Sequence, residues 1–234
     1  PGDAMISFVV PAYNEEKYLG ATLASIHEAA RAAGEPYELI VADDASTDAT
    51  AAIAQSAGAR LLRVEKRHIA AVRNAGAKVA AGDMLIFVDA DTVVNEAVVR
   101  AARAALTNGA VGGGATVMFG VAPGWVHAVM AMVRPIFRVM KWAPGCFVFC
   151  RREIFEKTDG FDERYFAGEE IHLSRALGRH GRFVVLRESV TTSARKSDDT
   201  SAWQMLWLMV KLVSRHPLGV KARKDAAFWY DVRR

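Results

Sequence analysis

The sequence predicts an α/β domain with a doubly wound, mostly parallel sheet. Four short apolar runs are expected to form buried strands, because continuous apolar stretches suit a sheet covered on both faces. These runs are residues 6–10, 37–42, 59–64 and 84–89. Alanine-rich stretches alternate with them and are expected to be helices, at residues 15–33, 47–57, 69–80 and 95–107. Such alternation is typical of sheets that bind ligands at the carboxyl ends of their strands.

The second half of the chain changes character without a linker. We expect a glycine-rich strand, a stretch rich in Met and Trp, a further strand and a helix that starts at an acidic pair. They correspond to residues 109–120, 124–143, 145–150 and 169–180. No internal repeat or Gly/Ser/Pro-rich tract separates them from the first half. The sequence therefore predicts one domain over residues 5–200, followed by an amphipathic helical extension at 201–234.

Composition narrows the class of protein. Of the 234 residues, 52% are hydrophobic, which supports a sizeable core and excludes a disordered or fibrous chain. The formal net charge of +4 is too small for the dense basic surface of a nucleic-acid binder. Anionic small molecules or a membrane surface remain compatible with it. We find no signal peptide ahead of the first strand and no uncharged run of the ~18 residues that a membrane-spanning helix needs.

The two cysteines, Cys146 and Cys150, lie in the apolar run CFVFC. In a strand they would be roughly 13 Å apart on one face, too far for a disulfide. Two cysteines are also too few for a structural zinc site, so we expect buried thiols and a cytoplasmic protein, with the cytoplasmic face of a membrane as a second possibility.

Polar residues follow the first two predicted strands directly. In PAYNEE, Pro11 is expected to end the strand, and Asn14 to cap a helix whose first turn holds Glu15 and Glu16. A capped turn without further function is the alternative. The second strand ends in Asp43 and Asp44, and adjacent carboxylates there are costly without partners. The edge of a nucleotide base or ribose hydroxyls could supply them.

The alternative for this second motif is a helix cap by Ser46 or Thr47, with spare acids beside it.

The fourth strand ends in Asp89 and Asp91. In an extended segment residues two apart face the same side, so both carboxylates can point at one site. Hard oxygen ligands of this kind suit Mg²⁺ or Mn²⁺ bridging two phosphates, whereas a solvated acidic turn is the simpler interpretation.

Two further segments carry candidate chemistry. Residues 66–76, KRHIAAVRNAG, bring cations near such a diphosphate, and Arg73 is the preferred contact because a guanidinium matches phosphate oxygens. An exposed basic helix face is the alternative. Glu169 and Glu170 begin a predicted helix, where they serve either as caps or as a general base for a sugar hydroxyl. His172, two residues on, is more often a structural side chain than a ligand.

Taken together, VVPAYNEE, VADDAST, FVDADT and GFDE…GEEIHLSRAL resemble glycosyltransferase family 2, an inverting family with the GT-A fold. The resemblance covers roughly residues 5–190. It implies a Rossmann-like nucleotide-sugar-binding half at 5–108 and a smaller acceptor half at 109–200. It further implies a nucleotide pocket lined by Pro11, Ala12, Tyr13 and Glu15, in which Asp43 binds the nucleotide base.

The same resemblance assigns the chemistry. It implies that Asp89 contacts ribose, that Asp91 holds the metal and diphosphate, and that the base lies in the acidic pair. Most members have Glu-Asp there, so Glu170 occupies the base position, and His172 departs from a second acid that often follows. A later basic residue often closes over the diphosphate, a role open to Arg195 or Lys196.

The expected function is direct displacement. Glu170 removes a proton from an acceptor hydroxyl while Mn²⁺ or Mg²⁺ on Asp91 neutralises the departing nucleoside diphosphate of a UDP- or GDP-sugar. A sugar-phosphate nucleotidyltransferase is a weaker alternative, because the start of the chain lacks the glycine-rich loop with Arg and Lys. A binding or scaffold protein that lost turnover is a second alternative.

Two stretches combine Trp, Met and Leu with cations at roughly helical spacing, residues 125–142 and 203–224. Such helices suit a bilayer interface, and the acceptor would then be a lipid or a lipid-linked sugar instead of a free saccharide. Packing on the sheet or a homodimer contact is the commoner use of such helices.

Overall fold

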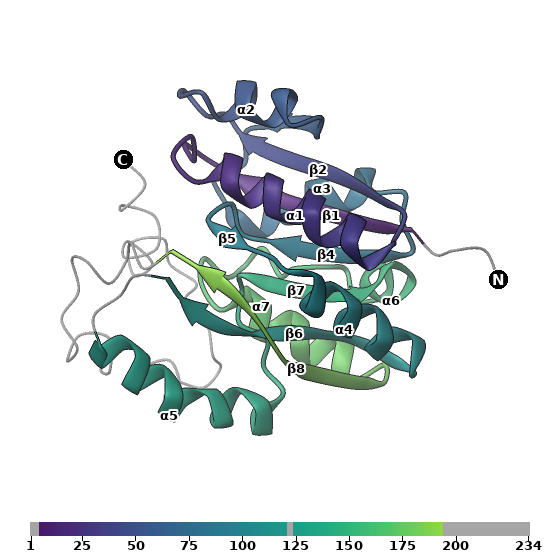
Figure 1. The fold of residues 1–234 in the computed structure, drawn as a ribbon. Helices are drawn as coiled ribbons and strands as arrows, with labels where there is room; N and C mark the ends of the chain where they lie inside the picture. Colours follow the sequence, from purple (N-terminus) through teal and green to yellow (C-terminus); the bar gives the residue numbers. More distant parts are fainter. Residues whose placement is uncertain (1–4, 121–123, 194–234) are drawn as a thin grey trace.

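Within residues 5–120 and 124–193, which the computed structural model describes, eight strands form one sheet in the order β3-β2-β1-β4-β7-β6-β8-β5 (Figure 1). The first four in this order are parallel: β3 (Arg60–Val64), β2 (Tyr37–Asp44), β1 (Ile6–Ala12) and β4 (Met84–Val88). They correspond to the four predicted strands, so the predicted parallel sheet of the first half is confirmed.

The other half of the sheet is mixed. Strand β7 (Phe147–Arg151) runs antiparallel to β4 and to β6 (Ala110–Phe119), and β8 (Arg182–Thr192) runs parallel to β6. The two-residue strand β5 (Thr92–Val93) pairs antiparallel with the end of β8. Strands β5 and β8 and the short helix α6 (Arg152–Lys157) are absent from the sequence-based expectation.

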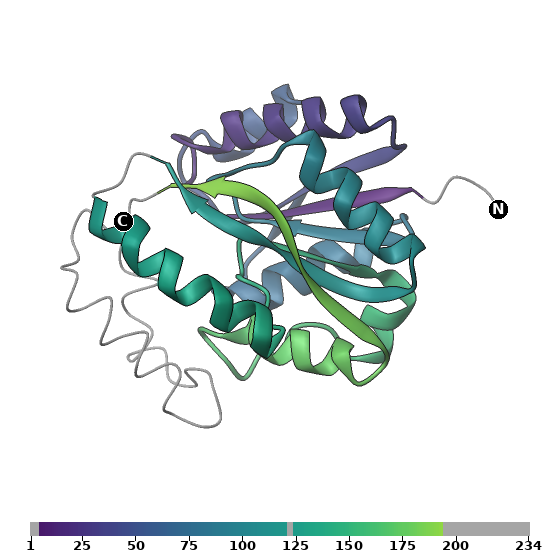
Figure 2. The same cartoon turned by 60° about the horizontal axis from the view of Figure 1, so that its bottom comes forward.

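Helices cover both faces of the sheet, as Figure 2 shows from a second direction. On one face α1 (Leu19–Ala33) and α4 (Glu96–Thr107) bury residues such as Phe8 and Leu23. On the other face α3 (Ile69–Val79), α6 and α7 (Glu169–Gly178) pack around Phe87 and Phe161. Helix α2 (Thr50–Ser56) flanks β3, and α5 (Gly124–Met140) lies beside β6 and β8.

The glycines of β6 have a packing reason. A Cβ built at Gly113 would lie 2.3 Å from the carbonyl oxygen of Val184, and one at Gly114 would lie 2.5 Å from the Cβ of Ala143. Larger residues would push β8 and the chain after α5 away from the strand. The predicted glycine-rich strand is thus a place where three segments approach one another closely.

The first turn of the chain differs from the prediction. Strand β1 does not end at Pro11 but continues to Ala12, because it still pairs with β2 there. The pairing of β1 with β4 stops at Val9. The missing amide hydrogen of Pro11 therefore cannot disturb the pairing with β4. Helix α1 begins at Leu19, not at residue 15, and the residues between form a turn of their own.

Candidate active site

The turn after β1 is locked to the loop after β2. Asn14 has a φ of 51°, which asparagine tolerates better than most residues, and its amide donates to Ser46 Oγ at 2.9 Å. Its side chain accepts from Thr47 N at 2.9 Å, so it joins two loops and does not cap α1 as predicted. Glu15 is buried, and its amide donates to Thr50 Oγ1 at 2.8 Å. This clamp fixes the position of the neighbouring Tyr13.

The paired acids at the end of β2 have unequal partners. Asp44 accepts from the amides of Lys66 at 2.6 Å and Arg67 at 3.1 Å, which holds the next loop in place. Asp43 accepts from the amide of Ser46 at 3.1 Å through Oδ1. Its other oxygen, Oδ2, is buried without a hydrogen-bond partner among the described residues, and its ion pair with Nε of Arg63 is long, at 3.9 Å, and comes from an exposed side chain.

The missing hydrogen bond of this oxygen is chemically informative. A buried carboxylate oxygen loses its hydration and is costly to leave unpaired, so it suits a donor group from a ligand. The alternative of a helix cap by Ser46 or Thr47 is wrong, because α2 is preceded by Ala49 and has no side-chain cap. Arg67, from the loop that Asp44 holds, lies 4.7 Å above the ring of Tyr13. Tyr13 and Asp43 thus border the same edge of the sheet.

The acids after β4 do not face one point in the way predicted. Residues 89–91 form a turn, in which the amide of Thr92 donates to the carbonyl of Asp89 at 3.0 Å, and are not extended. Asp89 binds Arg73, whereas Asp91 accepts from Ser193 Oγ at 2.6 Å at the end of β8. Both carboxylates therefore have protein partners, which argues against a merely solvated acidic turn.

The donor set still fits a hard divalent cation. No cluster of three or more His, Cys, Asp or Glu side chains occurs in the described part of the chain. Mg²⁺-type ions commonly use one or two carboxylates and complete their shell with water and substrate phosphates. Asp91 offers a carboxylate of this kind at the sheet edge. The residues fit such an ion when a phosphate ligand accompanies it.

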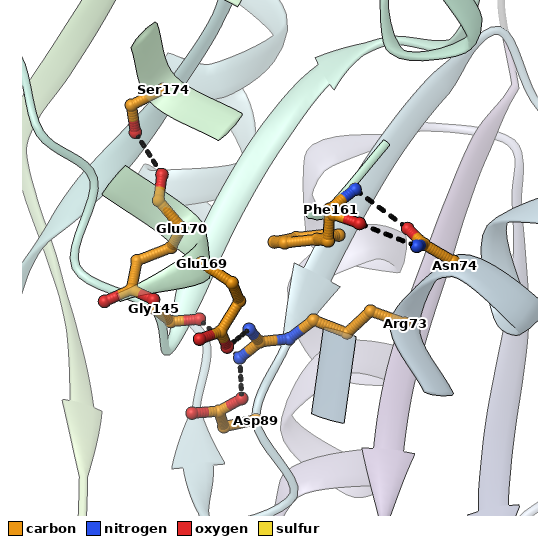
Figure 3. Close-up of polar contacts among 8 residues, drawn as sticks. All are labelled: Arg73, Asn74, Asp89, Gly145, Phe161, Glu169, Glu170 and Ser174. Atoms are coloured by element: carbon orange, nitrogen blue, oxygen red, sulfur yellow. Dashed lines mark hydrogen bonds and ion pairs between the residues drawn. The ribbon is translucent and has the colours of Figure 1, made fainter. Parts of the chain in front are cut away.

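Arg73 connects this edge to α7, as Figure 3 shows. Its guanidinium donates to Asp89 and to Glu169, each at 2.7 Å, and to the carbonyl of Gly145 at 3.1 Å. The side chain is 2% exposed, so the alternative of an exposed basic helix face is wrong. Burial alone would lower the pKa of Arg73, but Asp89 and Glu169 outweigh it and raise the pKa. The predicted phosphate contact is replaced here by a buried link between two acids.

The two glutamates at the start of α7 lie in different surroundings. Gly168, with a φ of 84°, turns the chain into the helix, and Glu169 lies buried against Arg73. Glu170 points away from Arg73 and is half-buried (Figure 3). Burial, with the negative charge of Glu169 second, raises the pKa of Glu170 to about 8, although Arg73 opposes the rise. A carboxylate titrating near neutrality is suited to accept a proton.

Sequence reasoning missed two residues that shape this site. Asn74 accepts from the amide of Phe161 and donates to its carbonyl, both at 2.9 Å, which ties α3 to the loop before α7. His68 is buried with both ring nitrogens unpartnered among the described residues, and its ring lies 4.4 Å from that of Phe166. Neither role has a sequence signal, because both depend on contacts with residues about 90 positions away. His172, left open above, stacks on Tyr165 at 3.8 Å.

Other predictions have mixed outcomes. Both cysteines are buried free thiols, as expected. Residues 124–140 form helix α5, and Trp142 beyond it is buried. In the described part of the chain no helix combines the length and the apolar character needed to cross a bilayer. Arg195, Lys196 and the stretches 203–224 and 201–234 lie outside the described residues, and membrane contact stays a prediction.

Comparison with known proteins supports the architecture. The chain superposes on TarS from S. aureus bound to UDP-GlcNAc with a TM-score of 0.65 and 20% identity, over 98% of this chain and 72% of that one. A mannosyltransferase from Pyrobaculum calidifontis, bound to GDP-Man and Mn²⁺, gives a TM-score of 0.65 and 18% identity over 97% and 69%. The fold is therefore of the GT-A type.

Sequence comparison also matches the chain to sugar transferases. The undecaprenyl-phosphate 4-deoxy-4-formamido-L-arabinose transferase of Pectobacterium carotovorum is 36% identical over 97 residues, which are 37% of this chain and 28% of that protein. The chain thus matches well under half the length of this relative. The family model described as glycosyl transferase family 2 matches residues 7–164, more than half of the chain. The chain therefore belongs to glycosyl transferase family 2.

Proposed function

We propose that this protein transfers a sugar from a UDP- or GDP-sugar to an acceptor hydroxyl with inversion at the anomeric carbon. The observation that carries the proposal is Glu170, a half-buried carboxylate whose pKa is raised to about 8 beside the Arg73 link to Asp89. UDP-GlcNAc and GDP-Man in the structurally similar proteins support this donor class.

The nucleotide would occupy the edge formed by Pro11, Ala12, Tyr13 and Glu15. The Oδ2 of Asp43, which lacks a hydrogen bond among the described residues, would accept one from the base, while Asp44 and Glu15 hold the surrounding loops through backbone amides. Asp89, oriented by Arg73, would face the ribose. We assign Arg73 to positioning, because its guanidinium already binds two carboxylates.

The transfer step is a single displacement. The acceptor oxygen attacks the anomeric carbon and forms the new glycosidic bond as the bond to the diphosphate oxygen breaks. Glu170 takes the proton of the acceptor hydroxyl, and the electron pair of the broken bond leaves with the nucleoside diphosphate. Mn²⁺ or Mg²⁺, held by Asp91 with Asp89 nearby, would supply positive charge to that leaving group. Arg195 could add to it from beyond the described residues.

We also propose one domain over residues 5–200, with donor and acceptor halves meeting at residue 108. The acidic surroundings of Glu170 lie where these halves meet, because Asp89 follows β4 and Arg73 lies on α3, whereas α7 follows β7. A saccharide or a lipid-linked sugar would approach from the acceptor half.

The direct test is release of nucleoside diphosphate from UDP-, GDP- and dTDP-sugars in the presence of Mn²⁺. Glu170→Gln keeps the shape of the side chain, so donor binding should persist while transfer falls by roughly 10²-fold or more. Asp91→Ala should remove metal-dependent nucleotide binding and leave the fold intact. Glu153→Gln, an exposed acid on α6, is the matched control. Full transfer by Glu170→Gln would contradict the proposed base.

A further inference from the structure

A small cavity between α5 and the sheet contains two arginines. Thr116 of β6 and Val185 of β8 form its floor, and Arg134, Phe137 and Arg138 of α5 form its roof. Its volume is about 40 Å³, whereas one water needs roughly 10–15 Å³ by the same measure. The space is therefore comparable to a carboxylate or phosphate group.

Among the residues that the structure describes, the arginines of this cavity have no anionic partner. The Nε of Arg134 is buried without a hydrogen-bond partner among the described residues, and one of its terminal nitrogens faces the thioether of Met118, a weak acceptor. Arg138 donates to Thr116 Oγ1 at 3.0 Å, a neutral hydroxyl. In the described part of the chain neither arginine forms an ion pair.

The surrounding sequence makes this arrangement unusual. The chain contains no aspartate or glutamate between Glu96 and Glu153, so no acid close in sequence can neutralise the pair. Like charges four residues apart on a helix repel each other, and a buried N–H without an acceptor costs free energy. An anion from outside the chain would relieve both costs.

The cavity adjoins the proposed base. Pro144 forms part of its wall, and the next residue, Gly145, lies so close to Glu170 that a Cβ built on it would be 3.4 Å from the carboxyl carbon. The amide of Ala143 donates to Ser174 Oγ at 3.1 Å on α7, and this hydroxyl donates to the carbonyl of Glu170 at 2.7 Å. One short segment thus separates the two arginines from the carboxylate.

We propose that Arg134 and Arg138 bind the phosphate of a phosphorylated acceptor, whose hydroxyl then lies beside Glu170. The use of this site in sugar transfer rests on the proposed function. The binding of phosphate by the two arginines does not. Two guanidinium groups, each with several N–H donors in a plane, match the oxygens of a phosphate better than those of a neutral sugar. The phosphate can belong to a soluble acceptor or to a lipid headgroup.

The test measures binding of glycerol phosphate by calorimetry, with uncharged glycerol as the negative probe. Saturating nucleoside diphosphate and Mn²⁺ are present, so the phosphate subsite of the donor is filled wherever the proposed function holds. We expect binding by the native protein, at least a tenfold loss of affinity in Arg138→Gln, and a larger loss in the double variant with Arg134→Gln. Arg31→Gln, an exposed arginine on α1, should bind like the native protein.

A second arm distinguishes the two sources of phosphate. Vesicles of phosphatidylcholine with and without phosphatidic acid are sedimented with the protein. Binding that occurs only with phosphatidic acid vesicles, and that Arg138→Gln abolishes, would support a lipid-held acceptor. Binding of glycerol phosphate without binding to vesicles would support a soluble acceptor. Phosphate binding that is absent from both arms, or unchanged in Arg138→Gln, would overturn the proposal. Arg138 is exposed, so its replacement tests the idea even if Arg134→Gln fails to fold.

The outcome is independent of the proposed function. Nucleotide binding and donor hydrolysis should be near native in the Arg138→Gln variant, because this residue lies outside the donor pocket. Failure of the native protein to bind any nucleotide would contradict the transferase proposal, whereas the glycerol phosphate measurement would stand without it.

Discussion

Replacing Glu170 with glutamine should stabilise the metal-free protein at alkaline pH. Folding raises the pKa of this carboxyl from 4.5 to about 8, so the folded state favours the protonated form. Stability from this group is complete below about pH 4.5 and is lost as pH rises to about 8, because the unfolded chain then releases the proton more readily. Glutamine cannot lose that proton, so Glu170→Gln should escape the loss.

The magnitude follows from the two pKa values. At about 1.4 kcal/mol for each tenfold change in the acid constant, the full rise corresponds to roughly 5 kcal/mol. Glu170 is half-buried and keeps some contact with water, so we expect about 2–3 kcal/mol above pH ~8.

The assay is urea unfolding of both proteins in EDTA at several pH values. The free energy of unfolding of Glu170→Gln should exceed that of the native protein by a margin that grows with pH. Glu153→Gln serves as the control for loss of a surface carboxylate. A difference that does not change with pH, or one in which the native protein gains on the variant as pH rises, would refute the reasoning.

Four further outcomes follow from the same geometry. Native transfer should rise as pH rises through about 8, and Glu169→Gln should move that rise in kcat/KM to lower pH, because it removes a negative charge beside the base. Arg73→Met should cost about 3 kcal/mol or more in urea unfolding, since two acids lose their cation. Asp43→Asn should weaken nucleotide binding about tenfold or more in calorimetry. Gly76→Ala should lower stability by about 1–3 kcal/mol, because its Cβ would lie 2.4 Å from Val9 Cγ1.

The first half of the fold was predictable because three of its four predicted strands, β1, β2 and β4, are largely buried. Strands β1 and β4 are mostly apolar runs, and the next helix along the chain, α1 or α4, has alanine on its inner side. Strand β8 has no such signal, since RFVVLRESVTT mixes exposed polar residues with buried ones. Its place beside β6 depends on pairing with a strand about 70 residues earlier in the chain. Pattern reading within a short window does not detect such pairing.

The position of the site could be predicted from the sequence, but the contacts among its residues could not. The carboxyl ends of parallel strands must meet at one edge, which was enough to select Asp43, Asp89 and Asp91. The partners of these acids were not predictable. Arg73 contacts Asp89 at a separation of 16 residues and Glu169 at one of 96, and the sequence alone suggested a phosphate contact for the same guanidinium. Tertiary packing therefore changes the role of a residue without changing its chemistry.

The choice between Glu169 and Glu170 as the base illustrates this point. Position in the helix does not separate them, because each is an acid in the first turn of α7, and only the family resemblance placed the base at Glu170. Neighbouring residues on a helix point in different directions, so only one of the two can face Arg73. Glu169 does, and its carboxylate is occupied by the guanidinium at 2.7 Å. Three acids surround this one cation, and Glu170 is the one that forms no hydrogen bond with it among the described residues. A carboxylate that does not bind the guanidinium, and whose pKa is raised to about 8, is the one able to exchange a proton with an acceptor.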